Sequence, residues 1–484
     1  MSTLAKNTSY FTLALILQKI ISLSYFTIYA RALGPADLGK YYFAISVTSI
    51  FSIFIDFGLA NVVTREVAKF PEKAKSILAN VLAAKLPLAI LTVVAVLGWG
   101  KFSNYEALTM NLLYISSFAM VFDSFTNTFF AVARGFHNLK FESIASIIFQ
   151  LIILLASLFI LHENLGIVWL MGTLALASIF NLGYSLSVIK FVWKMSVRPS
   201  LDKALLKELF AIALPFGVFV IVQRFYTYFD SVLLFRLAGD RAVGLYQVPF
   251  KIIIALQFLP MAFVASLYPA LSSYWHTARE KLAGLFEQAI IYCSIIAVPV
   301  SLGSIFLAEK IVKLFSSQFD ESALLLKVSM AAVPFMFLGF PVGSLLNACD
   351  RQKRNTINMT ITAIISAVLN LILIPRLGVL GACITTLITS ILMLSLGWQV
   401  IPSITKLHWK KVLSSLLRII LSGFVMVVVV VSVKNLLNPI ITIIIAAITY
   451  ALMLLLFGVV KKSDVFSFIN SFRNKESSSD LVSN

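Results

Sequence analysis

Long apolar stretches separated by short polar segments dominate the pattern of this 484-residue chain. A helix that crosses a bilayer needs about 20 mostly apolar residues. By this criterion the pattern predicts fourteen transmembrane helices, at 10–33, 41–64, 78–99, 107–133, 142–161, 166–189, 210–235, 243–271, 284–308, 322–347, 357–374, 379–401, 412–433 and 438–460. Turn-forming or charged residues occupy the breaks, and no break is long enough for a soluble domain. The pattern therefore predicts an all-α integral membrane protein.

The composition supports this interpretation. The chain is 60% apolar and 12% charged, with a mean hydropathy of +0.96, whereas soluble chains are about 45–50% apolar and roughly 25% charged. Such hydrophobicity also excludes intrinsic disorder. The cysteines Cys293, Cys349 and Cys383 are far apart in apolar sequence. Their spacing is not that of a metal site, so we expect packed thiols, and we expect neither a metal nor another cofactor.

Basic residues outnumber acidic ones by 39 to 21, and most of them lie in the short breaks. One alternate set of breaks and termini holds 24 basic residues, and the opposite set holds 9. Because cytoplasmic loops are enriched in Lys and Arg, this bias predicts a multi-pass cell-membrane protein with both termini in the cytoplasm. The positive charge is then expected to face anionic membrane lipids, and no nucleic acid partner is expected.

The sequence contains an internal repeat. A shift of 205 residues matches, without a gap, Lys19 with Arg224, Arg31 with Arg236, Gly34 with Gly239, Gly39 with Gly244 and Tyr41 with Tyr246. A shift of 212 residues matches 165–167 with 377–379. Six spans separate equivalent elements, and an even number makes the repeats parallel.

The repeat predicts two six-helix halves around a central cavity, plus two extra C-terminal helices. We place the domains at 1–195 for the N-terminal half, 196–207 for a basic cytoplasmic linker, 208–402 for the C-terminal half, 403–460 for helices 13 and 14, and 461–484 for a disordered cytoplasmic tail. Transporters with this architecture hold their substrate near the bilayer midplane, between the halves.

Two basic residues, Lys19 and Arg224, fall near the middle of their spans. A charge at that depth costs about 2.5–3.5 kcal/mol. One hypothesis is a structural ion pair with Asp230 or Asp123; the other, which we favour, is that both cations face a wet cavity. Polar residues at helical spacing accompany them on the same spans.

From these polar faces we predict a substrate-binding set of Lys19, Arg224, Lys251, Gln18, Gln223, Tyr25, Asp230, Asp123 and Asn127. A second set, predicted to serve gating or access from the cytoplasm, comprises Asp56, Arg65, Lys85 and Arg134. Arg and Lys side chains bind phosphate groups, and tyrosines stack on sugar rings. A cavity with these side chains favours an anionic, sugar-containing substrate.

Three segments resemble a known family. They are Arg31-Ala-Leu-Gly34-Pro35-Ala-Asp-Leu-Gly39-Lys-Tyr41 followed by Asp56-Phe57-Gly58-Leu59 and Arg65-Glu66; Asp230-Ser-Val-Leu-Leu with Gly244-Leu-Tyr246; and Asn370-Leu-Ile-Leu-Ile-Pro375-Arg-Leu-Gly378-Val-Leu-Gly381-Ala. Over residues 1–460 the chain is similar to polysaccharide flippases, the Wzx-like branch of the multidrug/oligosaccharidyl-lipid/polysaccharide (MOP) exporter superfamily.

This resemblance implies that the protein moves a lipid-linked oligosaccharide, on a polyprenyl phosphate or pyrophosphate carrier, from the cytoplasmic to the outer leaflet by alternating access. An ion such as H⁺ or Na⁺ is a possible energy source, because no Gly-rich nucleotide-binding loop is present. Two alternatives stay open. A cation-coupled drug antiporter of the same superfamily would need an acidic cavity, and a membrane glycosyltransferase or polymerase would need a large extramembrane loop or an acid/base cluster. We therefore expect a transporter and not an enzyme.

Overall fold

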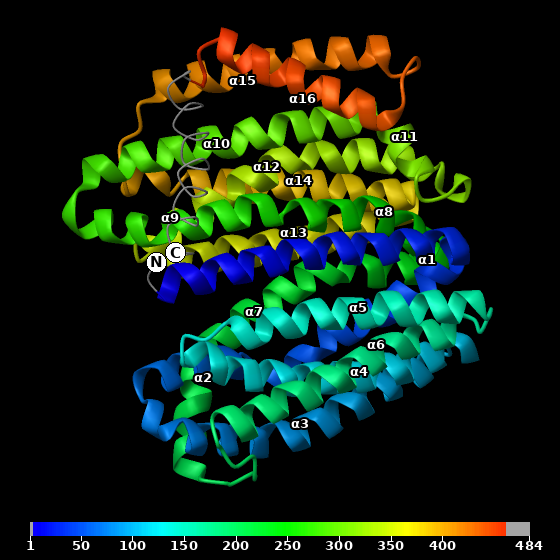
Figure 1. Cartoon of the computed structure of the whole chain (residues 1–484), viewed down its shortest axis with the longest axis vertical. Helices are drawn as coiled ribbons and strands as arrows, with labels where there is room; N and C mark the ends of the chain where they lie inside the picture. Colours follow the sequence, from blue (N-terminus) through cyan, green and yellow to red (C-terminus); the bar gives the residue numbers. More distant parts are fainter. Residues whose placement is uncertain (1–2, 461–484) are drawn as a thin grey trace, which may run out of the picture. The chain divides into compact units, whose positions relative to one another are not determined.

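The computed structural model describes residues 3–460, and side chains from residue 13 onward, as an all-α protein (Figure 1). Its main helices are α1 (Thr3–Asp56), α2 (Leu59–Lys69), α3 (Ala74–Phe102), α4 (Ala107–Gly135), α5 (Lys140–His162), α6 (Ile167–Ser187), α7 (Lys203–Ala238), α8 (Asp240–Leu256), α9 (Phe258–Thr277), α10 (Arg279–Phe306), α11 (Ala308–Lys313), α12 (Ser322–Ala348), α13 (Gln352–Leu377), α14 (Val379–Trp398), α15 (Trp409–Val433) and α16 (Pro439–Leu456). The predicted tail, 461–484, lies outside the described residues.

The predicted number of spans is confirmed. Within residues 3–460, thirteen helical segments are long and apolar enough to cross a membrane. The first of them, Leu13–Asp56, contains two of the fourteen predicted stretches, because α1 consists of two helices joined at a kink. The chain is a multi-pass membrane protein.

Glycines with a positive φ angle separate these helices at matched positions of the repeat. Gly34 divides α1 with φ 71° and ψ 178°, and Gly239 separates α7 from α8 with φ 88° and ψ 177°. Gly166 and Gly378, matched by the second shift, also have positive φ. Glycine adopts these angles without the steric cost that a Cβ atom imposes. The backbone thus repeats the pattern that the sequence comparison detects.

The predicted span 41–64 extends too far. The second part of α1 ends at Asp56, because Phe57 and Gly58 both have positive φ, 43° and 79°, and break the helix. The following residues form the separate helix α2, which buries one side against its neighbours and exposes basic residues on the other. An apolar count along the sequence cannot detect this break, because Phe57 and Leu59 continue the hydrophobic run.

Helices α1 and α8 meet at two matched glycines. A Cβ atom built on Gly39 would collide with the backbone carbonyl group of Asp240. A Cβ atom on Gly244 would collide with the carbonyl group of Pro35, the residue that matches Asp240 under the 205-residue shift. The contact is therefore reciprocal, as expected for two repeats related by a pseudo-twofold axis.

Two matched arginines reinforce the same end of these helices. Arg31 donates to the carbonyl oxygen of Leu314 through Nε at 3.0 Å and Nη2 at 2.7 Å. Arg236 donates to Ser103 Oγ at 2.5 Å, and its guanidinium carbon lies 5.3 Å from the ring centre of Tyr105. Arg31 contacts the segment before α12, and Arg236 contacts the segment before α4. Each repeat thus contacts the matching connection of the other repeat.

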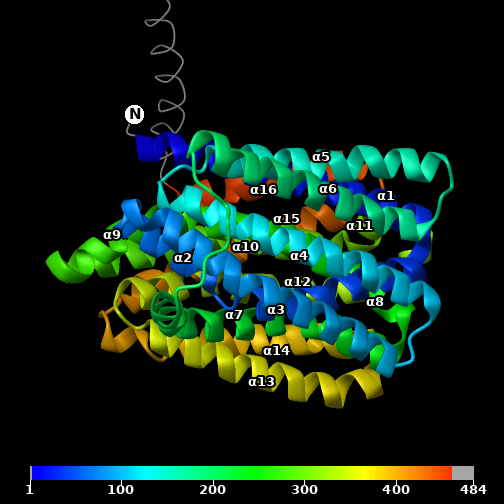
Figure 2. The same ribbon diagram turned by 90° about the horizontal axis from the view of Figure 1, so that it is seen from below.

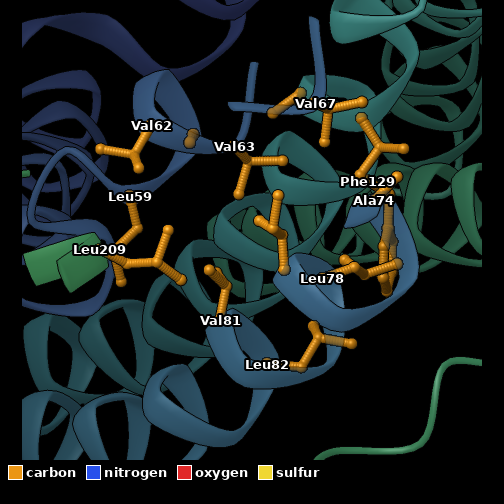
Figure 3. Packing of buried hydrophobic residues seen from close by; sticks show 14 of the residues in the cluster. Leu59, Val62, Val63, Val67, Ala74, Leu78, Val81, Leu82, Phe129 and Leu209 are labelled. Atoms are coloured by element: carbon orange, nitrogen blue, oxygen red, sulfur yellow. The ribbon is translucent and has the colours of Figure 1, made fainter. Parts of the chain in front are cut away.

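By contacts, the described residues form two compact units: 3–262, 312–325 and 356–389 in the first, and 263–311, 326–355 and 390–460 in the second. In the first unit, helices α3, α4, α5 and α6 lie side by side (Figure 2). Apolar side chains of α2 and α3 and Leu209 of α7 pack together in one buried cluster (Figure 3). In the second unit, α10, α15 and α16 share an apolar core. The domain boundaries drawn from the sequence stay a prediction.

The glycine crossing generates a testable prediction. Gly39→Ala should lower the free energy of unfolding by about 1–3 kcal/mol, because the added methyl group has no space against the Asp240 carbonyl group. Thermal unfolding of the detergent-purified protein measures the effect. Gly98→Ala is the matched control, since a Cβ built at that helical position has no atom within 4 Å beyond its chain neighbours and the backbone of its own helix. Equal melting temperatures for the two variants would contradict the assigned role of the crossing.

Candidate functional site

A cavity of about 200 Å³ lies within the first unit, between α1, α7 and α8. Polar and aromatic side chains provide most of its lining: Lys19, Ser22, Phe26, Tyr42, Ser46, Tyr228, Gln247, Phe250 and Lys251. Two of the three predicted cations, Lys19 and Lys251, thus line one cavity.

The two repeats contribute matched positions to the lining. Tyr42 corresponds to Gln247 under the 205-residue shift, and Ser46 corresponds to Lys251. All four line the cavity, but their chemistry differs between the halves. The two repeats therefore place equivalent backbone positions at the cavity but carry different side chains there. At the second pair of positions, the second repeat has the cation Lys251 where the first has Ser46.

An aromatic ring holds the Lys251 ammonium group in place. Its Nζ atom lies 4.1 Å from the ring centre of Tyr42, within the range of a cation–π interaction. Tyr42 is 4% exposed, so its ring is a fixed support. Gln247 donates to Ser231 Oγ at 3.2 Å and is also buried.

The electrostatic character of the cavity is positive. No carboxylate is among its lining residues, whereas the two lysines Lys19 and Lys251 both line it. Within residues 13–460 neither ammonium group has an ion-pair partner. An unpaired cation at membrane depth is costly unless it faces water or a ligand anion. The arrangement can therefore bind phosphate or carboxylate groups.

The other predicted residues of α1 and α7 lie beside this cavity and do not line it. Gln223 and Arg224 are exposed on α7, and the Arg224 guanidinium carbon lies 5.9 Å from the ring centre of Tyr228, which does line it. Gln18 is half-buried on α1. Tyr25 accepts a hydrogen bond from Ser22 at 3.4 Å.

The predicted acidic residues lie apart from these cations. Asp230 is 7% exposed; Asn370 Nδ2 donates to its Oδ1 at 2.6 Å, and the Tyr246 hydroxyl donates to its Oδ2 at 3.1 Å. Asp123 is half-buried on α4. Among the described side chains, neither carboxylate forms an ion pair with Lys19 or Arg224.

Two residues of the predicted gating set form a buried ion pair. Lys85 Nζ donates to Asp56 Oδ1 at 2.6 Å, to Thr128 Oγ1 at 2.6 Å and to the carbonyl oxygen of Ser124 at 2.9 Å. Lys85 is fully buried. All three ammonium hydrogens thus have acceptors. The pair joins the end of α1 to α3 and α4, next to the break at Phe57.

The remaining predicted residues have local partners. Arg134 donates to Glu142 Oε1 at 2.7 Å and to Asn127 Oδ1 at 2.8 Å, so the structure brings Arg134 and Asn127 together at the end of α4. Arg65 is exposed on α2, with its Nε 3.6 Å from Glu66 Oε1.

The predicted set omitted several residues that the structure places in the site. Tyr42, Ser46, Tyr228 and Gln247 line the cavity. Tyr42 and Gln247 occupy matched repeat positions, so the repeat itself was the signal that could identify them. Asn370 carried no such signal, because its contact with Asp230 joins helices 140 residues apart in sequence.

These features define a class: a multi-pass helical membrane protein with two parallel repeats and a cationic cavity between matched helices. A family model described as "Polysaccharide biosynthesis protein" matches residues 4–275, more than half of the chain. The chain belongs to this family. A second model, MatE, matches residues 215–375.

The chain is also similar to a curated relative in sequence and to solved structures in fold. The chain is 19% identical to the probable low-salt glycan biosynthesis flippase Agl15 of Haloferax volcanii, over 74% of this chain and 75% of that protein. Its fold is similar to that of the lipid II flippase MurJ in an inward closed conformation, with a TM-score of 0.77, 17% identity, and coverage of 92% and 98%. An inward-facing multidrug resistance MATE transporter gives a TM-score of 0.65 at 14% identity, covering 80% and 93%.

The buried ion pair yields a prediction about stability. Lys85→Met should lower the free energy of unfolding by about 3–5 kcal/mol, because Asp56 is left without its buried partner. Thermal unfolding in detergent tests this. Lys101→Met, which removes an exposed lysine from the last turn of the same helix, should change the value by less than about 0.5 kcal/mol. A Lys85 variant as stable as the Lys101 variant would show that the pair does not stabilise the fold.

Proposed function

We propose that this protein is a flippase that moves a lipid-linked oligosaccharide, carried on a polyprenyl phosphate or pyrophosphate, from the cytoplasmic to the outer leaflet by alternating access. The observation that carries the proposal is the cavity in which Lys19 and Lys251 lie together without a carboxylate. It moves its substrate without making or breaking covalent bonds, and is therefore a transporter and not an enzyme.

The chemistry of the cavity matches the polar part of such a substrate. Ammonium groups bind phosphate oxygens as point charges, and in the low-dielectric interior of a membrane protein this attraction is strong. Tyr42 and Tyr228 offer aromatic faces for a sugar ring, and Ser22, Ser46 and Gln247 offer hydrogen bonds. The names of Agl15, a probable glycan biosynthesis flippase, and of MurJ, a lipid II flippase, support the same activity.

The drug-antiporter alternative has weaker support. The MatE model and the MATE structure show the shared fold. A site for cationic drugs would need carboxylates directed at the ligand, whereas none lines this cavity. The lining thus favours an anionic substrate.

The remaining predictions about topology and access form part of the same proposal. The excess of basic residues in alternate loops supports a plasma-membrane protein with both termini in the cytoplasm. On this orientation Asp56 and Arg134 lie at the cytoplasmic ends of α1 and α4, and Arg65 lies on α2, which follows Asp56. Lys85 reaches Asp56 from about three turns inside α3, and together these residues would control access to the cavity.

For energy coupling, we infer that Asp230 holds an ion, H⁺ or Na⁺. Its carboxylate is buried and lacks a cationic partner among the described residues, while Asn370 and Tyr246 hold both of its oxygens in position. Buried ionisable groups inside membrane helices commonly mark proton or ion pathways. The matched position of the first repeat is Tyr25, so the second repeat alone carries an acid here.

The cavity predicts a transport defect without a folding defect. Lys19→Ala combined with Lys251→Ala should slow flipping of a fluorescent polyprenyl-pyrophosphate glycan at least tenfold in proteoliposomes, because the phosphate loses both cations. Leaflet exposure of the probe is the readout, and a cationic drug serves as the transport control. The membrane level of the variant should be unchanged, because neither lysine forms an ion pair with the described residues.

The matched control is Arg376→Ala, which removes an exposed cation from the last turn of α13 and should flip the probe at the wild-type rate. Lys251→Arg, which keeps the charge, should retain part of the activity. Wild-type transport by the double variant, or transport of the drug alone by the wild-type protein, would refute the proposal.

The coupling role predicts a loss of gradient dependence. Asp230→Asn should respond to neither an imposed pH gradient nor a Na⁺ gradient, whereas the wild-type protein should flip the probe several-fold faster under one of the two. Asparagine preserves the shape and most hydrogen bonds, so folding should be maintained. Asp320→Asn, which alters an exposed acid, is the control. Equal acceleration of the Asp230 and Asp320 variants would place the coupling site elsewhere.

A further inference from the structure

The segment 193–202, which overlaps the start of the predicted linker 196–207, is an ordered strap. Its residues alternate: Trp193, Met195 and Val197 pack against the apolar cluster formed by α2, α3, α4 and α7, whereas Lys194 and Arg198 are exposed. The Trp193 ring also stacks on the ring of Phe136 at 5.8 Å. An alternating pattern of this kind gives the strap one apolar side and one basic side.

Backbone hydrogen bonds hold the strap against α3. The Ser200 amide donates to the carbonyl oxygen of Ala79 at 3.2 Å, and the Asp202 amide donates to Asn80 Oδ1 at 2.6 Å. The Asp202 carboxylate accepts from the amides of Ala204 and Leu205, at 2.9 and 3.2 Å, and so caps α7. The basic side chains of the strap therefore project from a fixed support.

Helix α2 covers the same apolar cluster from a different segment. Its residues Leu59, Val62 and Val63 are buried in the cluster (Figure 3). Arg65 and Lys69, on the other side of α2, are exposed. We call the exposed side of α2, of the short turn after it, of the helical turn 188–192 and of the strap the basic ledge; its defining residues are Arg65, Lys69, Lys73, Lys190, Lys194 and Arg198.

The described residues neutralise little of the charge of the basic ledge. Segments 65–75 and 190–207 contain nine basic and three acidic residues. Of the acids, Glu66 is buried and Asp202 caps α7. Within the described residues, the contact of Arg65 with Glu66 at 3.6 Å is the only ion pair that involves these cations. The positive-inside rule accounts for the number of these residues, but not for their fixed placement on one packed support.

Exposed apolar residues accompany the cations and indicate what kind of partner the basic ledge contacts. Phe70 is 43% exposed and Phe191 is 71% exposed. The ammonium groups of Lys73 and Lys190 lie 5.0 and 5.6 Å from the centres of these rings, respectively. Apolar rings beside lysines are typical of surfaces that insert into the boundary between headgroups and acyl chains. If the partner were an acidic protein, its binding would use the basic residues of the ledge but would not need the exposed rings.

We propose that the basic ledge is a docking surface for anionic phospholipid headgroups. The cations contact the headgroup phosphates, and Phe70 and Phe191 enter the adjacent acyl region. A polybasic surface near a membrane attracts anionic lipids through each Lys or Arg that it presents. This site is separate from the cavity at Lys19 and Lys251 and does not depend on the transported substrate.

The experiment compares lipid binding by the intact protein and two triple variants. Native mass spectrometry of the detergent-purified chain, titrated with phosphatidylglycerol or phosphatidylcholine, gives the affinity ratio for the two lipids. Lys69→Gln, Lys194→Gln and Arg198→Gln together should reduce this ratio at least fivefold, because each removes an exposed, unpaired cation. The control triple, Arg351→Gln, Lys353→Gln and Arg354→Gln, removes three exposed cations from the connection between α12 and α13 and should change it less than twofold.

A charge-preserving variant separates charge from folding. Lys69→Arg with Lys194→Arg should keep the wild-type ratio, and all variants should keep the wild-type melting temperature within about 2 °C. The proposal is overturned if the ledge triple keeps its preference for phosphatidylglycerol, as it would if the partner were an acidic protein. It is also overturned if the control triple loses as much preference as the ledge triple, since the effect would then be net charge alone.

Discussion

The backbones of α1 and α8 come into direct contact because positions 39 and 244 carry no side chain. This contact determines how closely the two repeats approach one another, and therefore the width of the cavity between α1, α7 and α8. Matched arginines on either side, Arg31 and Arg236, attach each repeat to a connection of the other. The crossing closes one end of the helix pair, and the lining residues Tyr42, Ser46, Gln247 and Lys251 follow it about one to two turns further along α1 and α8.

Two ways of accommodating a buried cation occur in the same unit. Lys85 is fully buried, and its three donors are used by Asp56, Thr128 and Ser124. Lys19 and Lys251 instead face a cavity and have no acceptor of opposite charge among the described residues. Because a desolvated charge is stable only with a partner, the first arrangement suits a structural role and the second suits binding of an anion from outside the chain.

The sequence predicted the number of spans and the repeat, and two of the three cations that it assigned to a cavity, Lys19 and Lys251, line one cavity. These features depend on local apolar content and on matching residue types at a constant shift, both of which are visible along the chain. Arg224 was assigned to the cavity by the same reasoning, yet it is exposed and contacts only the ring of Tyr228, a residue that lines the cavity. Under the 205-residue shift Arg224 occupies the position that matches Lys19. Each residue along a helix is rotated by about 100° from the one before it, so the direction of a side chain is sensitive to how its helix is turned. Small differences in helix rotation therefore direct equivalent side chains differently.

The sequence by itself determined that the chain is a helical membrane protein with two parallel repeats, because hydrophobic length and periodicity carry that information. Only the tertiary structure decided which charges are paired. The contact of Lys85 with Asp56, that of Asn370 with Asp230 and the position of Lys251 over Tyr42 each join different helices. Their geometry depends on how the helices rotate and cross, and packing against neighbouring helices sets both.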